Sequence, residues 1–229
     1  FIYLITDGNN PHGVSLSASK RHRLAELANY YKVPIIEDDP YGFLSYEEDI
    51  PPVKHYGGDW VCYVGTFSKV LAPSLRVGWI VVPETFICPL EILKESYDIN
   101  MATISQRSTT LLLDKMDFKA HVQMLSKEYK LRRDTMVASI KKHFPPETKF
   151  HIPENGIFIW VELASHFNTS RLLDISIKDK KVSFIPGSAF SADKRELAHN
   201  CMRLNFSHNN PQKIIEGIQR ISEAIGLNA

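Results

Sequence analysis

Residues 60–69, WVCYVGTFSK, run from an apolar stretch into two hydroxyl residues and a lysine. The apolar part, Trp60 to Val64, predicts a buried β-strand, and the polar part predicts a loop at its carboxyl end. Comparable short strands are predicted at 1–5, 33–37 and 77–82, with a helix at 17–31 between the first two. Near-continuous apolar strands that alternate with helices are typical of a parallel sheet with helical crossovers. The sequence therefore predicts an α/β fold with a mostly parallel sheet.

The second half of the chain predicts a smaller α+β unit. The pattern turns helical from about Glu91, and a long amphipathic helix is expected over 120–143, just before two prolines. Short strands are then predicted at 157–163, 181–185 and 202–206, followed by a helix at 211–225 with isoleucines on one face and Gly226 as its stop. We therefore expect one domain over 1–115 and a second, with the connecting helix, over 116–229.

Composition excludes several classes of protein. The 229 residues carry a net charge of +1 and are 44% hydrophobic, so bulk charge indicates neither a nucleic-acid nor a membrane partner. No apolar stretch is long enough to span a bilayer, and no signal peptide is visible. The three cysteines are scattered, which favours a reducing compartment and predicts a cytoplasmic protein. The nine histidines show no metal-binding spacing, so no metal site is expected.

Polar residues follow three of the predicted strands. Asn10, Asp38 and Lys69 each come after an apolar run. Because the carboxyl ends of parallel strands meet at one edge of a sheet, catalytic residues are expected to gather there. Lys69 directly follows Ser68, and Arg76 comes seven residues later. A lysine with a hydroxyl before it and an arginine after it suits a Schiff-base lysine beside a bound phosphate.

Four motifs together resemble the pyridoxal-phosphate (PLP) enzymes of fold type I, specifically the class I and II aminotransferases. They are Asn10-Pro11-His12-Gly13, Asp38-Asp39-Pro40-Tyr41, Thr66-Phe67-Ser68-Lys69 and Pro73-Ser74-Leu75-Arg76-Val77-Gly78. The resemblance covers essentially the whole chain. Within the class, the chain looks most like the branch of the kynurenine/2-aminoadipate aminotransferases and the MocR-type regulators. The resemblance implies an incomplete large PLP-binding domain followed by a small C-terminal domain.

The resemblance also implies a role for each residue around the PLP ring. Lys69 would hold the cofactor as a Schiff base and move protons between substrate and cofactor. Asp38 would face the pyridine nitrogen, and Tyr41 and Asn10 would hydrogen-bond the phenolic oxygen. The alternatives are a solvated surface lysine, a half-buried core tyrosine and an Asn-Pro turn. For Asp39 we adopt the turn before Pro40 as its role.

Further residues match the family's phosphate and substrate positions. Arg76 and Ser68, with Thr66 as a third candidate, would hold the phosphate. Arg203 resembles the arginine that binds the substrate carboxylate, where a bidentate pair would fix every α-amino acid in one pose. The alternatives are a surface ion pair for Arg76 and a strand-end surface arginine for Arg203.

The function implied by the resemblance is that of a PLP-dependent aminotransferase. Such an enzyme moves an amino group from an α-amino acid to a 2-oxo acid in ping-pong order. The family fold implies a homodimer. Two alternatives stay open: a PLP lyase or decarboxylase that uses the same pocket, and the ligand-sensing effector domain of a MocR-type transcription regulator, which would have a nucleic-acid partner. Aromatic, 2-aminoadipate-like and aliphatic substrates all fit the motifs.

Two departures from the family pattern stand out. Family members carry a Gly-Gly pair before the small-domain strand, where this chain has Asn155-Gly156. The chain also begins at Phe1 within an apolar run, without the long segment that precedes the Asn-Pro motif in the family. In the family that segment binds phosphate, stacks on the ring and reaches across the dimer. We therefore expect the chain to be a fragment of a longer protein.

Overall fold

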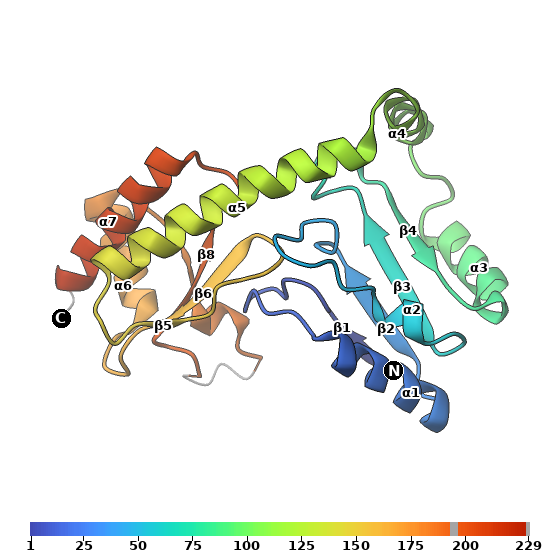
Figure 1. Cartoon of the computed structure of the whole chain (residues 1–229), viewed down its shortest axis with the longest axis horizontal. Coiled ribbons are helices and arrows are strands. Elements are labelled where there is room, and N and C mark those ends of the chain that lie inside the picture. The colour runs from blue at the N-terminus through green and yellow to red at the C-terminus, as the bar shows by residue number, and fades with distance from the viewer. Residues whose placement is uncertain (193–196, 228–229) are drawn as a thin grey trace. The chain divides into compact units, whose positions relative to one another are not determined.

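The computed structural model describes residues 1–192 and 197–227, which form two compact units (Figure 1). Unit 1 comprises residues 1–7 and 15–126. Unit 2 comprises residues 8–14 and the described residues from 127 onward. The short segment 8–14 thus leaves unit 1 after its first strand and belongs to unit 2. The domain boundary expected at residue 115 concerns the intact protein and stays a prediction.

Unit 1 is built on a four-stranded sheet, in which the strand order is β1-β2-β3-β4. The strands are β1 (Ile2–Leu4), β2 (Ile35–Asp39), β3 (Val61–Thr66) and β4 (Gly78–Val81). β2 runs parallel to β1 and to β3, whereas β4 pairs antiparallel with β3. The expected α/β fold with a mostly parallel sheet is therefore confirmed. β2 lies two residues later than the predicted strand at 33–37, so Asp38 and Asp39 are part of it.

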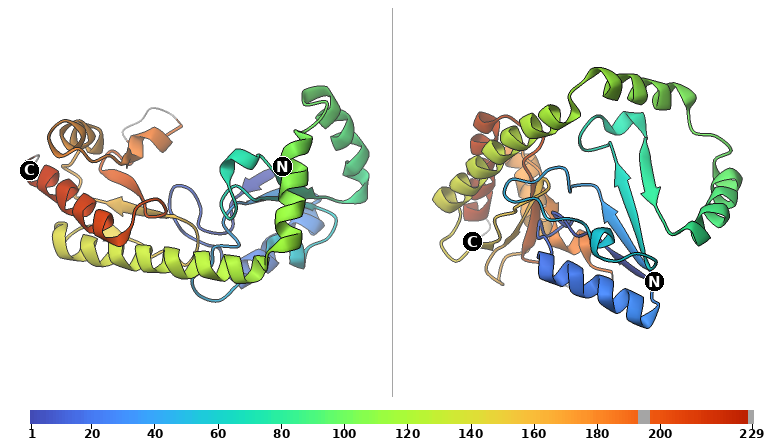
Figure 2. Two further views of the ribbon diagram at one scale, coloured as in Figure 1. Left: turned by 90° about the horizontal axis from the view of Figure 1, so that it is seen from above. Right: turned by 45° about the vertical axis from the view of Figure 1, so that its right-hand side comes forward.

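Unit 1 has four helices, of which α1 and α2 cover one face of this sheet (Figure 2). They are α1 (Ala18–Tyr31), α2 (Val53–Tyr56), α3 (Ile87–Tyr97) and α4 (Thr103–Lys115), with short 3-10 turns at Pro73–Leu75 and Glu84–Phe86. Ala25 and Ala28 of α1 and Val53 of α2 pack on Ile35 and Val61 of the sheet, and all five are buried. α1 ends at Lys32, which adopts a left-handed conformation with φ 54°.

Unit 2 is an antiparallel sheet packed with helices. Its strands are β5 (Lys149–Phe150), β6 (Phe158–Glu162), β7 (Ile185–Pro186) and β8 (Cys201–Asn205), in the order β5-β6-β8-β7. The helices are α6 (Thr169–Lys180), α7 (Pro211–Leu227) and the second half of α5 (Phe118–His143), with a 3-10 turn at Gly187–Phe190. The isoleucine face predicted for the last helix is confirmed, because Ile214, Ile218, Ile221 and Ile225 are all buried.

Two predictions for unit 2 are wrong. The strand expected at 181–185 is reduced to Ile185–Pro186, because Lys181 instead ends α6 in the left-handed conformation and its backbone N–H caps that helix. Gly226 does not stop the last helix, which continues through it to Leu227. In both cases the end of the helix depends on a backbone conformation that is unusual for the residue type: a left-handed lysine at 181 and a helical glycine at 226.

A buried ion pair joins α1 to the end of the first strand segment. Arg21 is fully buried, and its two terminal nitrogens donate to Asp7 Oδ2 at 2.8 Å and Asp7 Oδ1 at 2.7 Å. The Arg21 Nε donates to the Leu16 carbonyl at 2.9 Å. The remaining donors reach the carbonyls of Thr6, Ile50 and Pro51. A buried charge with every donor satisfied is stabilising only as long as its partner stays in place.

Glu37 on β2 is fully buried as well and serves α2. Its Oε1 accepts from the Val53 N–H at 2.8 Å, and its Oε2 accepts from the Lys54 N–H at 3.0 Å. Thr6 adds a hydroxyl donor to Oε1 at 2.9 Å. The carboxylate thus satisfies the free N–H groups at the start of α2, where a negative charge is favoured.

Asp39 closes the turn after β2 from a buried position. Its Oδ1 accepts from the Gly42 N–H at 2.6 Å, and its Oδ2 accepts from the Tyr63 hydroxyl at 2.8 Å. Burial raises the pKa of the Asp39 carboxyl to about 6; the bonds from Tyr63 and Gly42 oppose this rise, and nearby Asp7 and Glu37 add to it. Asp39 is therefore a turn residue, as expected, but one that is buried and titratable near neutral pH.

Replacing Arg21 by methionine leaves Asp7 buried without its partner. We expect Arg21→Met to lower the free energy of unfolding by about 3–5 kcal/mol, measured by urea unfolding followed by circular dichroism. Arg23→Met is the matched control, because Arg23 pairs with Glu26 at 2.9 Å on the exposed side of the same helix. The control should change stability by less than about 1 kcal/mol. Equal losses in the two variants would contradict this account of the ion pair.

The Asp39 pKa predicts a specific pH dependence of stability. The native carboxyl, with a pKa of about 6, binds a proton more tightly than the unfolded one, whose reference value is 3.8. Native Asp39 is then largely protonated at pH 4.5 and pays for burying its charge at pH 7.5. Between these values the stability of the wild type should fall relative to Asp39→Asn, which does not ionise, by about 2 kcal/mol. A stability difference that is constant across this range in urea titrations would refute the assignment.

Candidate functional site

Asp38 lies on the sheet face opposite Glu37 and Asp39. Successive side chains of a strand point to opposite faces, and in β2 the buried residues alternate with half-buried ones. Asp38 was expected to follow the strand, and this was wrong, because it is the second-last residue of β2. Its Oδ2 accepts a hydrogen bond from the Tyr3 hydroxyl at 2.5 Å. The carboxylate therefore sits near the carboxyl end of a central strand, on the face that α1 does not cover.

The loop after β3 presents two hydroxyls and an amine. Thr66 ends the strand, its Oγ1 donates to Ser68 Oγ at 3.0 Å, and the Ser68 N–H donates to Thr66 Oγ1 at 3.1 Å. Lys69 is exposed, while the next residue, Val70, is buried and anchors the loop. Among the described residues the Lys69 amine makes no hydrogen bond or ion pair, so it is accessible as a nucleophile.

Arg76 and Tyr41 complete the predicted residues of unit 1. Arg76 follows the turn Pro73–Leu75 in a left-handed conformation with φ 55°, is exposed, and donates from Nη1 to the Pro73 carbonyl at 3.2 Å. Tyr41 is buried in the turn after β2, and its role at the cofactor stays a prediction. The Tyr41 hydroxyl is close enough to Tyr3 to affect the pKa of the Tyr3 phenol. The hydrogen bond to Asp38 raises the pKa of Tyr3 to about 12, with smaller contributions from burial and from Tyr41.

Unit 2 brings the other two predicted residues together. Arg203 on β8 donates from Nη1 to Asn10 Oδ1 at 2.6 Å. Its guanidinium lies over the Phe158 ring at 4.2 Å and over the Phe190 ring at 5.1 Å, which restricts its orientation. Because Asn10 accepts through its oxygen, its amide N–H groups remain as donors. Asn10 lies in a turn with a cis bond to Pro11, and its role at the cofactor stays a prediction.

The loop that holds Asn10 depends on a close contact between two glycines. Gly8 and Gly156 both have positive φ, of 51° and 79°, and a Cβ on Gly8 would lie 2.7 Å from the Gly156 Cα. Asn155 is buried next to these two glycines. The close contact between the two segments is made by Gly8 and Gly156. The departure from Gly-Gly to Asn155-Gly156 therefore leaves intact the glycine that the close contact requires.

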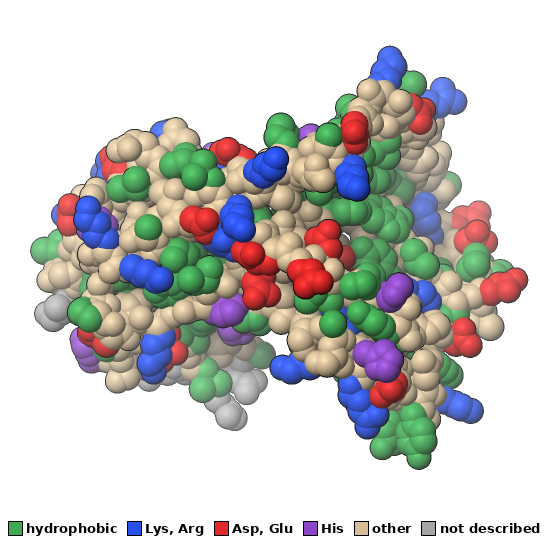
Figure 3. All heavy atoms as spheres, viewed as in Figure 1, with side chains coloured by type: hydrophobic (Ala, Val, Ile, Leu, Met, Phe, Trp, Pro, Cys, Tyr) green, Lys and Arg blue, Asp and Glu red, His purple; other side chains and the backbone are tan. Residues whose placement is uncertain are grey.

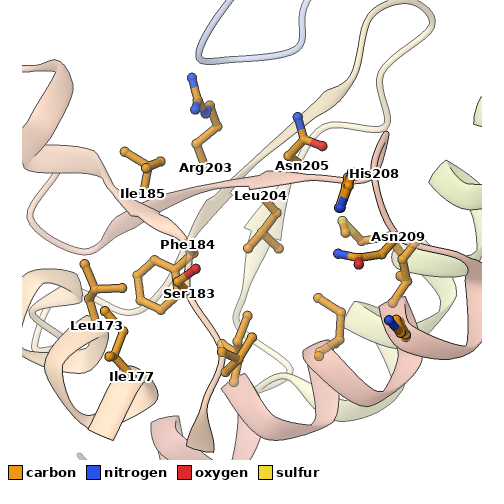
Figure 4. A pocket seen from close by; sticks show the side chains of 17 residues that line it. Leu173, Ile177, Ser183, Phe184, Ile185, Arg203, Leu204, Asn205, His208 and Asn209 are labelled. Atoms are coloured by element: carbon orange, nitrogen blue, oxygen red, sulfur yellow. The ribbon is translucent and has the colours of Figure 1, made fainter.

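Next to Arg203, unit 2 contains a pocket of about 440 Å³ that both apolar and polar side chains line (Figure 4). Figure 4 shows Leu204 pointing into it together with Phe184, Leu173 and Ile177, whereas Arg203 points away from these side chains. The alternation along β8 thus separates a buried apolar side from the side that carries Arg203 and Asn10.

Several other kinds of site find no support in the described residues. They contain no cluster of histidine, cysteine, aspartate or glutamate that could hold a metal ion. In the same residues, no helix is long and apolar enough to cross a membrane. Figure 3 shows acidic and basic side chains interspersed over one face of the molecule, in keeping with the net charge of +1.

Sequence reasoning missed one residue of the site, Tyr3. It lies within the first apolar run and looked like a strand residue only. The signal was the sheet register: once β1 and β2 are paired with Tyr3 opposite Ile36, Tyr3 is diagonal to Asp38 on the same face.

Known proteins match nearly the whole length of this chain. The family model "Aminotransferase class I and II" matches residues 2–221. The chain is 38% identical over 226 residues to aromatic-amino-acid aminotransferase 1 of Thermococcus litoralis, covering 98% of this chain and 54% of the relative. It is 30% identical over 230 residues to the mitochondrial kynurenine/alpha-aminoadipate aminotransferase of Mus musculus, with 98% and 54% covered.

Solved structures agree with the sequence comparison. The crystal structure of a Pyrococcus horikoshii kynurenine aminotransferase in complex with PMP superimposes with a TM-score of 0.91 at 37% identity, covering 98% of this chain and 55% of that one.

The relatives also include an uncharacterized HTH-type transcriptional regulator, YisV, of Bacillus subtilis, at 30% identity with 97% of this chain and 45% of the regulator covered.

The chain thus spans about half the length of the curated relatives it matches. The resemblance noted from the motifs, including the branch with kynurenine/aminoadipate aminotransferases and regulators, is confirmed. The chain belongs to the class I and II aminotransferase family.

Proposed function

We propose that the intact protein is a PLP-dependent aminotransferase that moves the amino group of an α-amino acid to a 2-oxo acid. The observation that carries this proposal is the pair of neighbouring strand ends in unit 1. Asp38 lies at the end of β2, and Thr66, Ser68 and the accessible Lys69 lie at the end of the adjacent β3. The family match over nearly the whole chain supports the same activity.

The residues present fit the chemistry of the cofactor. A phosphate needs hydroxyl and guanidinium donors, which Thr66, Ser68 and Arg76 would provide. The Asp38 carboxylate fits a protonated ring nitrogen. When bound, PLP supplies an electron sink for the negative charge that develops at the substrate Cα.

Lys69 would perform the covalent and proton-transfer steps. Its ε-amine would hold the cofactor covalently between turnovers, and the freed amine would then take the proton from the substrate Cα. Asp38 would keep the ring nitrogen protonated, and Tyr41 would donate a hydrogen bond to the phenolic oxygen. The amide of Asn10 would donate to the same oxygen.

Arg203 would bind the carboxylate of the substrate. Its guanidinium is oriented by Phe158, Phe190 and the Asn10 oxygen, so little side-chain freedom is left to lose when a carboxylate binds. A bidentate pair would then hold any α-amino acid with its Cα in a defined position. Arg203 would therefore fix the common part of all substrates, leaving side-chain selection to other residues.

The remaining parts of the proposal concern the whole protein. We propose that it works in the cytoplasm as a homodimer, with a large domain that includes residues 1–115 and a small domain that includes residues 116–229. The three cysteines are free thiols, which is compatible with a reducing compartment. Amino acids and 2-oxo acids would be its small-molecule partners.

One assay separates this function from its alternatives. The full-length protein with PLP is given an amino acid, with and without a 2-oxo acid acceptor, and both keto-acid product and ammonia are measured. Sustained keto-acid formation that requires the acceptor supports an aminotransferase. Ammonia release without an acceptor would indicate a lyase instead. Cofactor binding without turnover would indicate a regulator's effector domain.

Lys69→Arg keeps the positive charge but removes the amine that the chemistry needs. We expect the rate of keto-acid formation in a single turnover to fall by about 100- to 10,000-fold. Lys20→Arg, on the exposed surface of α1, is the matched control and should leave this rate unchanged. A rate in Lys69→Arg within a few-fold of the wild type would rule out Lys69 as the catalytic lysine.

Arg203→Lys keeps a cation but loses the planar fork. We expect the KM for the amino acid to rise by about tenfold or more, because one donor replaces a bidentate pair. The comparison is with Arg171→Lys, an exposed arginine of α6, which should leave KM unaltered. The carboxylate role fails if steady-state kinetics give the same KM for wild type and Arg203→Lys.

A further inference from the structure

Tyr3 and Asp38 form a pair on the sheet face that α1 and α2 leave uncovered. Tyr3 lies on β1 opposite Ile36 of the parallel strand β2, so it is the diagonal neighbour of Asp38. The two side chains meet at 2.5 Å between the phenol oxygen and Asp38 Oδ2. This distance is typical of a hydrogen bond from a hydroxyl to an ionised carboxylate.

The bond occupies one oxygen of Asp38 and leaves the other available. Among the described residues, no donor reaches Asp38 Oδ1. The phenol of Tyr3 has a single proton, and its pKa of about 12 keeps that proton in place at any physiological pH. The Asp38 carboxylate is therefore held in one rotamer, with one acceptor oxygen still to be used.

We propose that Tyr3 is a positioning residue for Asp38: it orients the carboxylate so that Oδ1 accepts the N–H of the cofactor's pyridine ring. This inference rests on the proposed PLP-dependent function. Tyr3 itself does not touch the reacting atoms. Its contribution is to restrict, through this hydrogen bond, a carboxylate that would otherwise rotate freely.

The neighbouring pair Tyr63–Asp39 provides a natural comparison within the same sheet. There, too, a tyrosine on an adjacent strand donates to an aspartate of β2, at 2.8 Å, but on the buried face. Asp39 also accepts from the backbone of Gly42, so both of its oxygens are used to close a turn. Within the described part of the chain Asp38 has only its tyrosine, which distinguishes a carboxylate held for a ligand from one that is part of the structure.

The test measures PLP binding to the full-length protein by equilibrium dialysis, together with the pH dependence of the absorbance of bound cofactor. We expect Tyr3→Phe to raise the Kd for PLP by about tenfold, as loss of one hydrogen bond to a charged group does. It should also shift the pH midpoint of the cofactor absorbance, while the melting temperature of the apoprotein stays unchanged because Tyr3 is 56% exposed. Tyr63→Phe is the matched control, expected to lower the melting temperature without changing the Kd.

A double-mutant cycle shows whether Tyr3 acts through Asp38. In an Asp38→Asn background, Tyr3→Phe should have no further effect on the Kd. The inference is overturned if Tyr3→Phe binds and titrates PLP like the wild type, or if its effect is the same in both backgrounds. Failure of the wild-type protein to bind PLP would instead overturn the proposed function, and this inference with it.

Discussion

Three carboxylates lie buried on one face of the unit 1 sheet with a single buried cation, and the fold of this unit depends on how each is satisfied. Arg21 neutralises Asp7 through two parallel hydrogen bonds. Glu37 is stabilised by the N–H groups at the start of α2. Asp39 has Tyr63 and Gly42, and its pKa of about 6 shows that this compensation is incomplete. Each of these interactions connects two elements. Asp7 connects the segment after β1 to α1, Glu37 connects β2 to α2, and Asp39 connects the turn after β2 to β3.

This distribution of charge leaves Asp38 free for the chemistry proposed for it, while Glu37 and Asp39 serve the structure. Because side chains alternate along a strand, Glu37 and Asp39 point to the buried face and Asp38 to the other one. The buried pair ties β2 to the start of α2, to the turn at Gly42 and to Tyr63 of β3. Asp38 then emerges at a defined point beside the hydroxyls at the end of β3, without any flexible loop to position it. A site placed on a strand in this way is more precise than one on a loop.

The sequence predicted the alternation of strands and helices, because the apolar runs and the isoleucine face of α7 follow directly from periodicity. The sequence-based prediction placed β2 two residues too early, because paired aspartates are typical of a loop. They fit in a buried strand only because Glu37 is paired with Thr6 and α2, and Asp39 with Tyr63. It missed the end of α6, where Lys181 takes a left-handed conformation usually left to glycine. The Asn10–Arg203 bond links residues 193 positions apart and therefore has no local signal at all.

Lys69 is the residue that we propose to bind the cofactor, and one measurement tests this role directly. The full-length protein is incubated with PLP, reduced with borohydride and digested, and the peptide that carries the cofactor is sequenced by mass spectrometry. We predict that the label is on Lys69, in the peptide that continues from Thr66-Phe67-Ser68. A label on any other lysine, or none in a protein that has been shown to fold, would contradict the assignment and the function built on it.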